Sequence, residues 1–280
     1  LGYYTCLTIG TNGTCAVLYK VSGYISSTSA YLSAVMPNSS SYAQAHQNVN
    51  DSTIKKVIDA WYSGGVTSNS ECYNSGYVNC NFTSLSSKLI DNSSLIANTP
   101  YCNDRTIGTG GTVATNTYTE LGYGGANSLY GAARRNFTGG SSGTTFSGAN
   151  ASPSYICPQN NDKFTLSSSF GGINGYGNNA LKYPIGLLTA DEAVFAGKPY
   201  GLGVTSNFLT ASATYWTMTP SHNLIQSGGA IDSYEATISS SLSTYQNSSA
   251  LSGVVPAISL KSSATISSGT GAYNSPYIIN

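Results

Sequence analysis

Few side chains in this sequence have the type and spacing that catalysis requires. The two imidazoles are His46 and His222, and neither lies in a recognisable catalytic motif such as Gly-x-Ser-x-Gly. The neighbouring acids Asp191 and Glu192 are expected on a helix, where adjacent side chains point about 100° apart and do not flank a common glycosidic bond. We therefore interpret the two acids as stabilisers of a first helical turn and predict that the protein is not an enzyme.

Oxygen-bearing side chains supply the candidates for a metal or for acid catalysis. Asn103, Asp104, Asn161 and Asp162 carry the oxygen atoms that calcium prefers, but the sequence has no loop of ligands at calcium-binding spacing. We predict no cofactor, with calcium as the alternative that remains open. A hydrolase that uses Asp104 or Asp162 is the least favoured function.

The six cysteines indicate structural chemistry. They have no Cys-x-x-Cys spacing and lie far from both histidines, so the pattern does not indicate zinc. An even number of cysteines in loop-like surroundings predicts three disulfides, which form in an oxidising compartment. Spacing does not determine the pairing, but short loops around Gly and Asn close easily, which favours Cys6–Cys15, Cys72–Cys80 and, as the remaining pair, Cys102–Cys157.

Charged residues are scarce and balanced. They make up 8% of the 280 residues, against roughly 25% in an average soluble domain, and eleven basic residues face eleven acidic ones. Nucleic acid is not an expected partner, because phosphate binding needs clustered bases and the nearest cluster is Arg134 with Arg135. Ser, Thr, Asn, Gly and 22 Tyr replace the charges, a composition that suits walls, pili and secreted scaffolds.

The sequence also predicts an extracellular, cell-surface location. It has no apolar run long enough to span a membrane. It begins at Leu1 without Met, so we expect a leader or an anchoring helix to have been removed. Eight glycosylation sequons would matter if the host glycosylates, at Asn12, Asn38, Asn50, Asn81, Asn92, Asn136, Asn150 and Asn247.

Two helices are expected. One runs from Ser52 to Ser63, with Ile54, Val57, Ile58 and Trp61 on its apolar face and with Lys55 and Lys56 in solvent. The other is capped by Thr189, runs over residues 190–196 through Asp191 and Glu192, packs through Val194 and Phe195, and ends at Gly197.

The remaining segments predict strands and loops. Residues 16–21 follow a turn and predict a strand, in a hairpin that Cys6–Cys15 would close. Long surface loops are expected over 104–180, above all over 139–152, and the Gly-rich stretch 171–177 is interpreted as turns. Residues 254–260 and 277–279 predict strands.

The sequence carries an ordered series of motifs, at residues 45–48, 54–62, 99–105, 157–165, 183–192, 215–221, 255–261 and 274–279. It resembles an uncharacterised extracellular domain family of Gram-positive, largely gut-dwelling bacteria, whose members occur in surface proteins and behind prepilin-like helices. The match covers about residues 45–280, and the carboxy-terminal motifs look like those of the C-type-lectin-like and formylglycine-generating-enzyme-like fold. Where the family pattern has Arg directly before the Pro of the 255–261 motif, this chain has Val255, and the copper-binding cysteine pair of those enzymes is not recognisable.

Together these observations predict a β-rich α+β protein of C-type-lectin-like fold, with few short helices, long Gly/Ser/Asn loops and about three disulfides. Residues 1–40 would form an amino-terminal strand or hairpin used for assembly through Leu1, Tyr3 and Tyr4, and residues 41–280 the lectin-like domain. The expected function is a structural or adhesive surface protein, the subunit of a homopolymeric filament or pilus. The alternative is a monomeric glycan- or receptor-binding module, with Tyr215, Trp216 and His222 at its ligand site.

Overall fold

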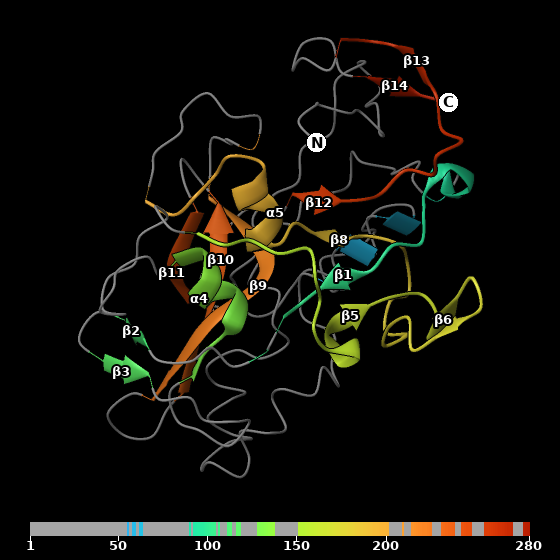
Figure 1. Cartoon of the computed structure of the whole chain (residues 1–280). Helices are drawn as coiled ribbons and strands as arrows, with labels where there is room; N and C mark the ends of the chain where they lie inside the picture. Colours follow the sequence, from blue (N-terminus) through green and yellow to red (C-terminus); the bar gives the residue numbers. More distant parts are fainter. Residues whose placement is uncertain are drawn as a thin grey trace.

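A computed structural model gives the structure of the chain (Figure 1). The residues that it describes are 55, 58–59, 62–63, 90, 92–104, 106, 111–113, 116–118, 128–137, 151–201, 209, 214–225, 231–238, 242–247, 255–270 and 277–280. Residues 1–40, the strand expected at 16–21 and the assembly residues Leu1, Tyr3 and Tyr4 lie outside them.

A four-stranded antiparallel sheet forms the centre of the described structure. Its strand order is β11 (Leu242–Asn247), β10 (Ile231–Ile238), β9 (Tyr215–Ile225) and β4 (Ser128–Leu129). The register of β9 against β10 shifts between Tyr234 and Glu235, opposite His222 and Pro220. Proline has no N–H to give to a ladder and is tolerated at such irregularities, so Pro220 coincides with the bend in an otherwise long strand.

Two short helices cover this sheet through small side chains. Helices α4 (Gly131–Phe137) and α5 (Ala190–Phe195) contact β9, and α5 also contacts β10 (Figure 1). Ala133, Ala190, Ala193 and Ala236 belong to the buried cluster between them, together with Tyr215 and Ile238. Methyl-sized side chains allow helix and sheet to approach closely, and the larger Tyr and Ile fill the remaining space.

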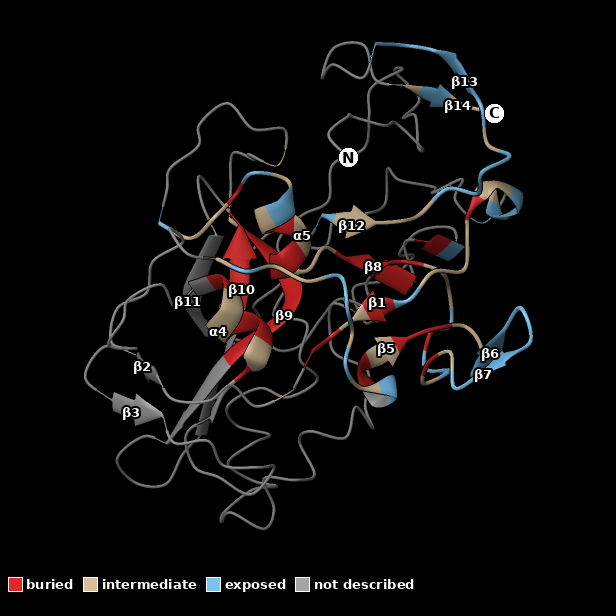
Figure 2. Cartoon of the chain, viewed as in Figure 1, coloured by how far each residue is buried: buried red, intermediate tan, exposed pale blue. Residues whose placement is uncertain are grey.

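Smaller antiparallel pairs surround the central sheet. Strand β1 (Tyr101–Cys102) pairs with β5 (Lys163–Phe164), and β8 (Gly186–Leu187) pairs with β12 (Pro256–Ala257). Two hairpins carry exposed side chains, β6 (Ser169–Phe170) with β7 (Ile173–Asn174), and β13 (Ile266–Ser268) with β14 (Ile278–Ile279) (Figure 2). The other described elements are η1 (Ser93–Leu95), η3 (Asn160–Asp162) and the pair β2 (Gly111–Val113) with β3 (Asn116–Tyr118).

Several sequence predictions are confirmed by these elements. The class is mixed α+β and β-rich, with few short helices. Helix α5 begins at its Thr189 cap, and Gly197 follows it with a φ of +86°. The stretch 171–177 contains turns on both sides of β7, and Gly171 and Gly172 join β6 to β7 with positive φ at both positions, as a tight hairpin requires. Strands β12 and β14 lie inside the two carboxy-terminal segments where strands were expected.

Other predictions are wrong. Helix α4 lies within 104–180, where long surface loops were expected, and Phe195, at the end of α5, is exposed and stacks on Tyr155 instead of packing into the core. Lys55 was expected in solvent, but it is buried on the same helical face as Ile58 and Tyr62 and bonds the Asp59 carboxylate one turn later. The pairing offsets the desolvation of both charges, which is why a lysine is tolerated there. Within the described residues, every helix is too short or too polar to cross a membrane.

Gly186 tests how tightly β8 packs on β1. A Cβ atom added at Gly186 would lie 2.3 Å from the Tyr101 ring, so Gly186→Ala should lower the free energy of unfolding by about 1–3 kcal/mol through overpacking. Gly171→Ala is the control, because open space surrounds it and only its left-handed backbone opposes the change, at a cost of about 1 kcal/mol. Urea unfolding measures both variants. An unchanged midpoint for Gly186→Ala would contradict the described packing.

Candidate functional site

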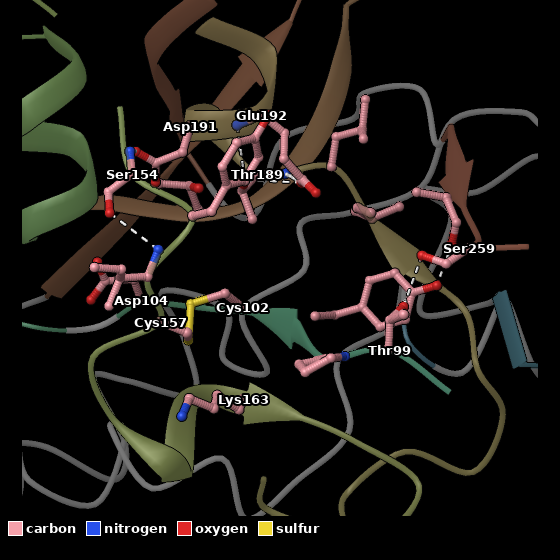
Figure 3. Close-up of a pocket in the computed structure, with 18 of the residues that line it drawn as sticks. Thr99, Cys102, Asp104, Ser154, Cys157, Lys163, Thr189, Asp191, Glu192 and Ser259 are labelled. Atoms are coloured by element: carbon pink, nitrogen blue, oxygen red, sulfur yellow. Dashed lines mark hydrogen bonds between the residues drawn. A yellow bond between two sulfur atoms is a disulfide. The ribbon is translucent and has the colours of Figure 1, made fainter. Parts of the chain in front are cut away.

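A cleft of about 510 Å³ lies beside α5 (Figure 3). Its lining comes from stretches within 99–104, 154–157, 187–192 and 257–259, with Arg135, Lys163 and Thr219. Figure 3 shows Asp104, Ser154 and Asp191 gathered at one end, and Thr99 and Ser259 at the other. A volume of several hundred cubic ångströms is typical of sites that enclose a small ligand.

An ion-pair network organises the acidic end of the cleft. Arg135, in the last turn of α4, donates from Nε and Nη2 to the two carboxylate oxygens of Asp191 at 2.7 and 2.5 Å. Its Nη1 atom donates to Asp104 at 2.6 Å. Burial of the guanidinium opposes its charged form, but the hydrogen bonds and charges of Asp191 and Asp104 outweigh this effect and raise the pKa of Arg135. Arg135 therefore stays charged and clamps α4 to α5.

Both carboxylates have further donors. Asp191 Oδ1 also accepts from Asn136 Nδ2 and from the Ser154 backbone N–H, each at 2.9 Å. Asp104 Oδ1 accepts from the backbone N–H and the hydroxyl of Thr106 at 3.0 and 2.5 Å. Each of the two carboxylates is thus fully engaged inside the protein.

The start of α5 forms a second wall. Thr189 Oγ1 accepts from the Glu192 backbone N–H at 3.1 Å, and the Glu192 carboxylate accepts from the Thr189 N–H at 2.8 Å. This reciprocal pair is a capping box, which follows from Thr three residues before Glu at a helix start. Glu192 thus receives hydrogen bonds from neutral groups of Thr189, whereas Arg135 pairs the two aspartates with a positive charge.

Tyr101 and a disulfide fix the strand beneath the cleft. The Tyr101 hydroxyl shares its one proton between the carbonyls of Pro184 and Ala257, at 3.2 and 3.0 Å, and burial raises its pKa, so it stays protonated. The neighbouring Cys102 is joined to Cys157 by a disulfide with Cα atoms 5.8 Å apart. This bond ties β1 to the segment 151–158, which has no helix or strand of its own.

An exposed aromatic pair stands at the mouth of the cleft. Tyr155 lines the cleft and stacks on Phe195, with ring centres 4.1 Å apart and planes within 9°. Tyr155 is 64% exposed, Phe195 45% and the adjacent Ile156 75%. Large apolar side chains exposed side by side at a cleft are typical of binding surfaces.

The aromatic ligand site expected at Tyr215 and Trp216 is wrong. Trp216 is completely buried and Tyr215 is 2% exposed, because both begin β9 in the centre of the sheet, beneath the helices. The Tyr215 hydroxyl donates to the Leu209 carbonyl at 2.7 Å, so even its polar end faces inward. His222 lies in β9 opposite Tyr234 and Leu129, and its side chain is outside the described residues.

The acids proposed for catalysis or calcium are buried. Asp104 bonds Arg135 and Thr106, and Asp162 has no exposed surface. The Asn103 N–H donates to the Asp162 carbonyl at 2.9 Å, which accounts for their proximity without a metal. Among the described residues, three or more His, Cys, Asp or Glu side chains do not gather in a group that could hold a metal ion. The lack of a cofactor and of enzymatic activity stay predictions.

The pairing of Cys102 with Cys157 is confirmed. Cys6, Cys15, Cys72 and Cys80 lie outside the described residues, and so do most of the sequons. The sequon at Asn136 is not accessible for glycosylation, because the Asn136 side chain is fully buried and donates to the Ala132 carbonyl and to Asp191. A glycan cannot be attached there in the folded protein.

Sequence reasoning missed the Arg135–Asp191 pair and the Tyr155–Phe195 stack. The run Ala132-Ala133-Arg134-Arg135 has high helix propensity and was a usable signal for α4. The residues that form each pair are 56 and 40 positions apart, so their contact depends on tertiary structure.

Comparisons with known proteins find no relative. No protein-family model, no curated protein and no solved structure matches the chain. The resemblance to extracellular domains of Gram-positive bacteria therefore stays a prediction. The function is argued from the cleft itself.

Removal of Arg135 tests whether the ion-pair network holds the cleft together. Arg135→Met should lower the free energy of unfolding by about 3–5 kcal/mol, because it leaves two buried carboxylates without their cation. Lys163→Met is the control, since the Lys163 ammonium bonds Asn160 in solvent and its loss should change stability by less than about 0.5 kcal/mol. Equal effects in chemical denaturation would refute the network's role.

The disulfide should stabilise both the fold and the cleft. The double variant Cys102→Ser/Cys157→Ser opens a covalent loop closed over a separation of 55 residues, with an expected loss of about 4 kcal/mol. Segment 151–158 should then become more accessible, which hydrogen exchange measures at the Ser152 and Ser154 amides. Unchanged protection there would show that hydrogen bonds alone hold the segment.

Proposed function

We propose that this chain is an extracellular adhesive surface protein that binds its receptor in the cleft beside α5. The observation that carries the proposal is the exposed Tyr155–Phe195 stack at the mouth of that cleft. Exposed aromatic rings lose little conformational entropy on binding and bury a large area, so they are efficient contacts for a partner.

Composition and covalent structure support an extracellular location. The low charge content gives a surface solvated by hydroxyls and amides, and the Cys102–Cys157 disulfide is stable in an oxidising compartment. The C-type-lectin-like fold belongs to the same proposal. It rests on the resemblance of the carboxy-terminal motifs and agrees with the β-rich class and short helices.

Ile156 and Ile173 offer a matched test of this function. Both are isoleucines with most of their surface exposed, but Ile156 lines the cleft and Ile173 lies on the β6–β7 hairpin. Adhesion of the purified chain to cell and matrix surfaces should weaken about 3- to 10-fold with Ile156→Ser, because the change removes apolar area from the contact. It should be unchanged with Ile173→Ser. A chain that adheres to no surface, or two variants with equal effects, would overturn the proposal.

A filament or pilus subunit is the second candidate. The β6–β7 and β13–β14 hairpins favour it, since among the described residues each is a two-stranded sheet, and they expose Phe170, Ile173, Ile266 and Ile278. Strand addition at such an edge is one physical route to a homopolymer. The amino-terminal residues expected to provide the added strand lie outside the described residues.

Electron microscopy of material sheared from producing cells tests the second candidate. Regular fibres that contain this chain are expected, and deletion of residues 1–20 should abolish them because it removes the strand available for addition. Ile156→Ser, in the cleft, should leave fibres intact. Dispersed monomers from the unaltered chain would exclude the filament, and normal fibres after the deletion would exclude that assembly mechanism.

A further inference from the structure

The charges that line the cleft are already used within the protein. Asp191 and Asp104 hold Arg135, and Glu192 holds the Thr189 cap. The Lys163 ammonium is the exception among them, because its bond to the neutral Asn160 side chain at 3.0 Å is exposed to solvent. An ionic ligand would have to compete with these bonds, and an anion would also meet three carboxylates. The electrostatics therefore favour a ligand without charge.

Neutral hydroxyls supply the remaining polar surface. The Thr99 hydroxyl donates to Ser259 Oγ at 2.8 Å at one end of the cleft, which leaves the Ser259 hydroxyl proton to be donated. At the other end, Ser154 Oγ accepts the Ile156 N–H at 3.1 Å and keeps its own proton as a donor. Groups that both donate and accept suit a partner with many hydroxyls.

The aromatic stack supplies a flat apolar face. Phe195 covers one face of Tyr155, and the parallel geometry holds the ring in place, while 64% of Tyr155 remains exposed. The apolar C–H face of a pyranose ring can pack on such a surface while its hydroxyls bond polar groups nearby. Proline-rich peptides also bind aromatic side chains, but they dock in grooves lined by several rings, whereas this cleft is rich in hydroxyls and has one exposed stack.

We infer that the cleft binds a neutral glycan. One sugar ring stacks on Tyr155, and hydroxyls of the glycan bond Ser154 at one end of the cleft and Ser259 at the other. This inference rests on the proposed adhesive function and names the class of receptor.

Variants of Tyr155 test the stacking directly. The full chain is applied to an array of neutral oligosaccharides ending in hexose or N-acetylhexosamine, with sialylated and sulfated oligosaccharides and proline-rich peptides on the same array. Neutral glycans should bind, and calorimetry should show about tenfold or more weaker binding for Tyr155→Ser and less than about twofold change for Tyr155→Phe, which keeps the ring. Phe170→Ser is the matched control, since Phe170 is 51% exposed and stacks on Tyr176 in a hairpin away from the cleft.

Several results would overturn the inference. These are selective binding of the acidic glycans or of the peptides, no binding to the array, or neutral-glycan binding that Tyr155→Ser leaves intact. Circular dichroism of each variant separates a lost contact from a lost fold.

Periodate treatment of the adhesion surface distinguishes the two proposals. Periodate cleaves the vicinal diols of sugars, so adhesion that depends on neutral glycans should fall to background. Adhesion that survives periodate but not protease would keep the adhesive function and refute the glycan. Absence of adhesion together with neutral-glycan binding on the array would refute adhesion and keep the glycan site.

Discussion

The clamp of Arg135 between Asp191 and Asp104 is the interaction on which the described site depends. It joins the last turn of α4 to the first turn of α5 and to the stretch after β1. The helix dipoles favour both placements, with a cation at a carboxyl end and an anion at an amino end. Segment 151–158 is attached to the same point, through the Ser152 N–H to the Arg135 carbonyl and the Ser154 N–H to Asp191. Because this segment carries Tyr155, the clamp also sets where the aromatic stack lies.

Features encoded by local chemistry could be predicted from the sequence. The α5 cap depends on Thr189 and Glu192 three residues apart, and the β6–β7 turn depends on two adjacent glycines with positive φ. Helix α4 and the buried Lys55 were not predicted. A seven-residue helix has little stability of its own. Helix α4 forms because it packs on the sheet and because its Arg135 pairs with Asp191. Lys55 is buried because Asp59 follows one turn later, a pairing that hydrophobic periodicity does not detect.

The sequence predicted aromatic side chains as candidates for a ligand site, but not which of them are exposed. An aromatic ligand site was expected, but 22 tyrosines do not reveal which rings are exposed. Trp216 lies in a central strand beneath two helices. The side chain that most favoured an aromatic ligand site therefore belongs to the hydrophobic core. Tyr155 lies in a segment without secondary structure, and Phe195 lies at the end of a helix whose buried residues are Ala190, Asp191 and Ala193. Exposure is a property of the fold, and local sequence patterns do not determine it.

Disulfide formation and the geometry of the candidate site are physically coupled in this arrangement. Segment 151–158 gains no stability from a helix or strand, so its position depends on two backbone hydrogen bonds at one end and the Cys102–Cys157 disulfide at the other. A reducing compartment would remove the second attachment and leave Tyr155 on a loop held through Arg135, Asp191 and the stack of Tyr155 on Phe195. Preorganised contacts bind more tightly because less entropy is lost on association. The proposed receptor site therefore acquires its geometry in the same oxidising environment in which an adhesive protein meets its receptor.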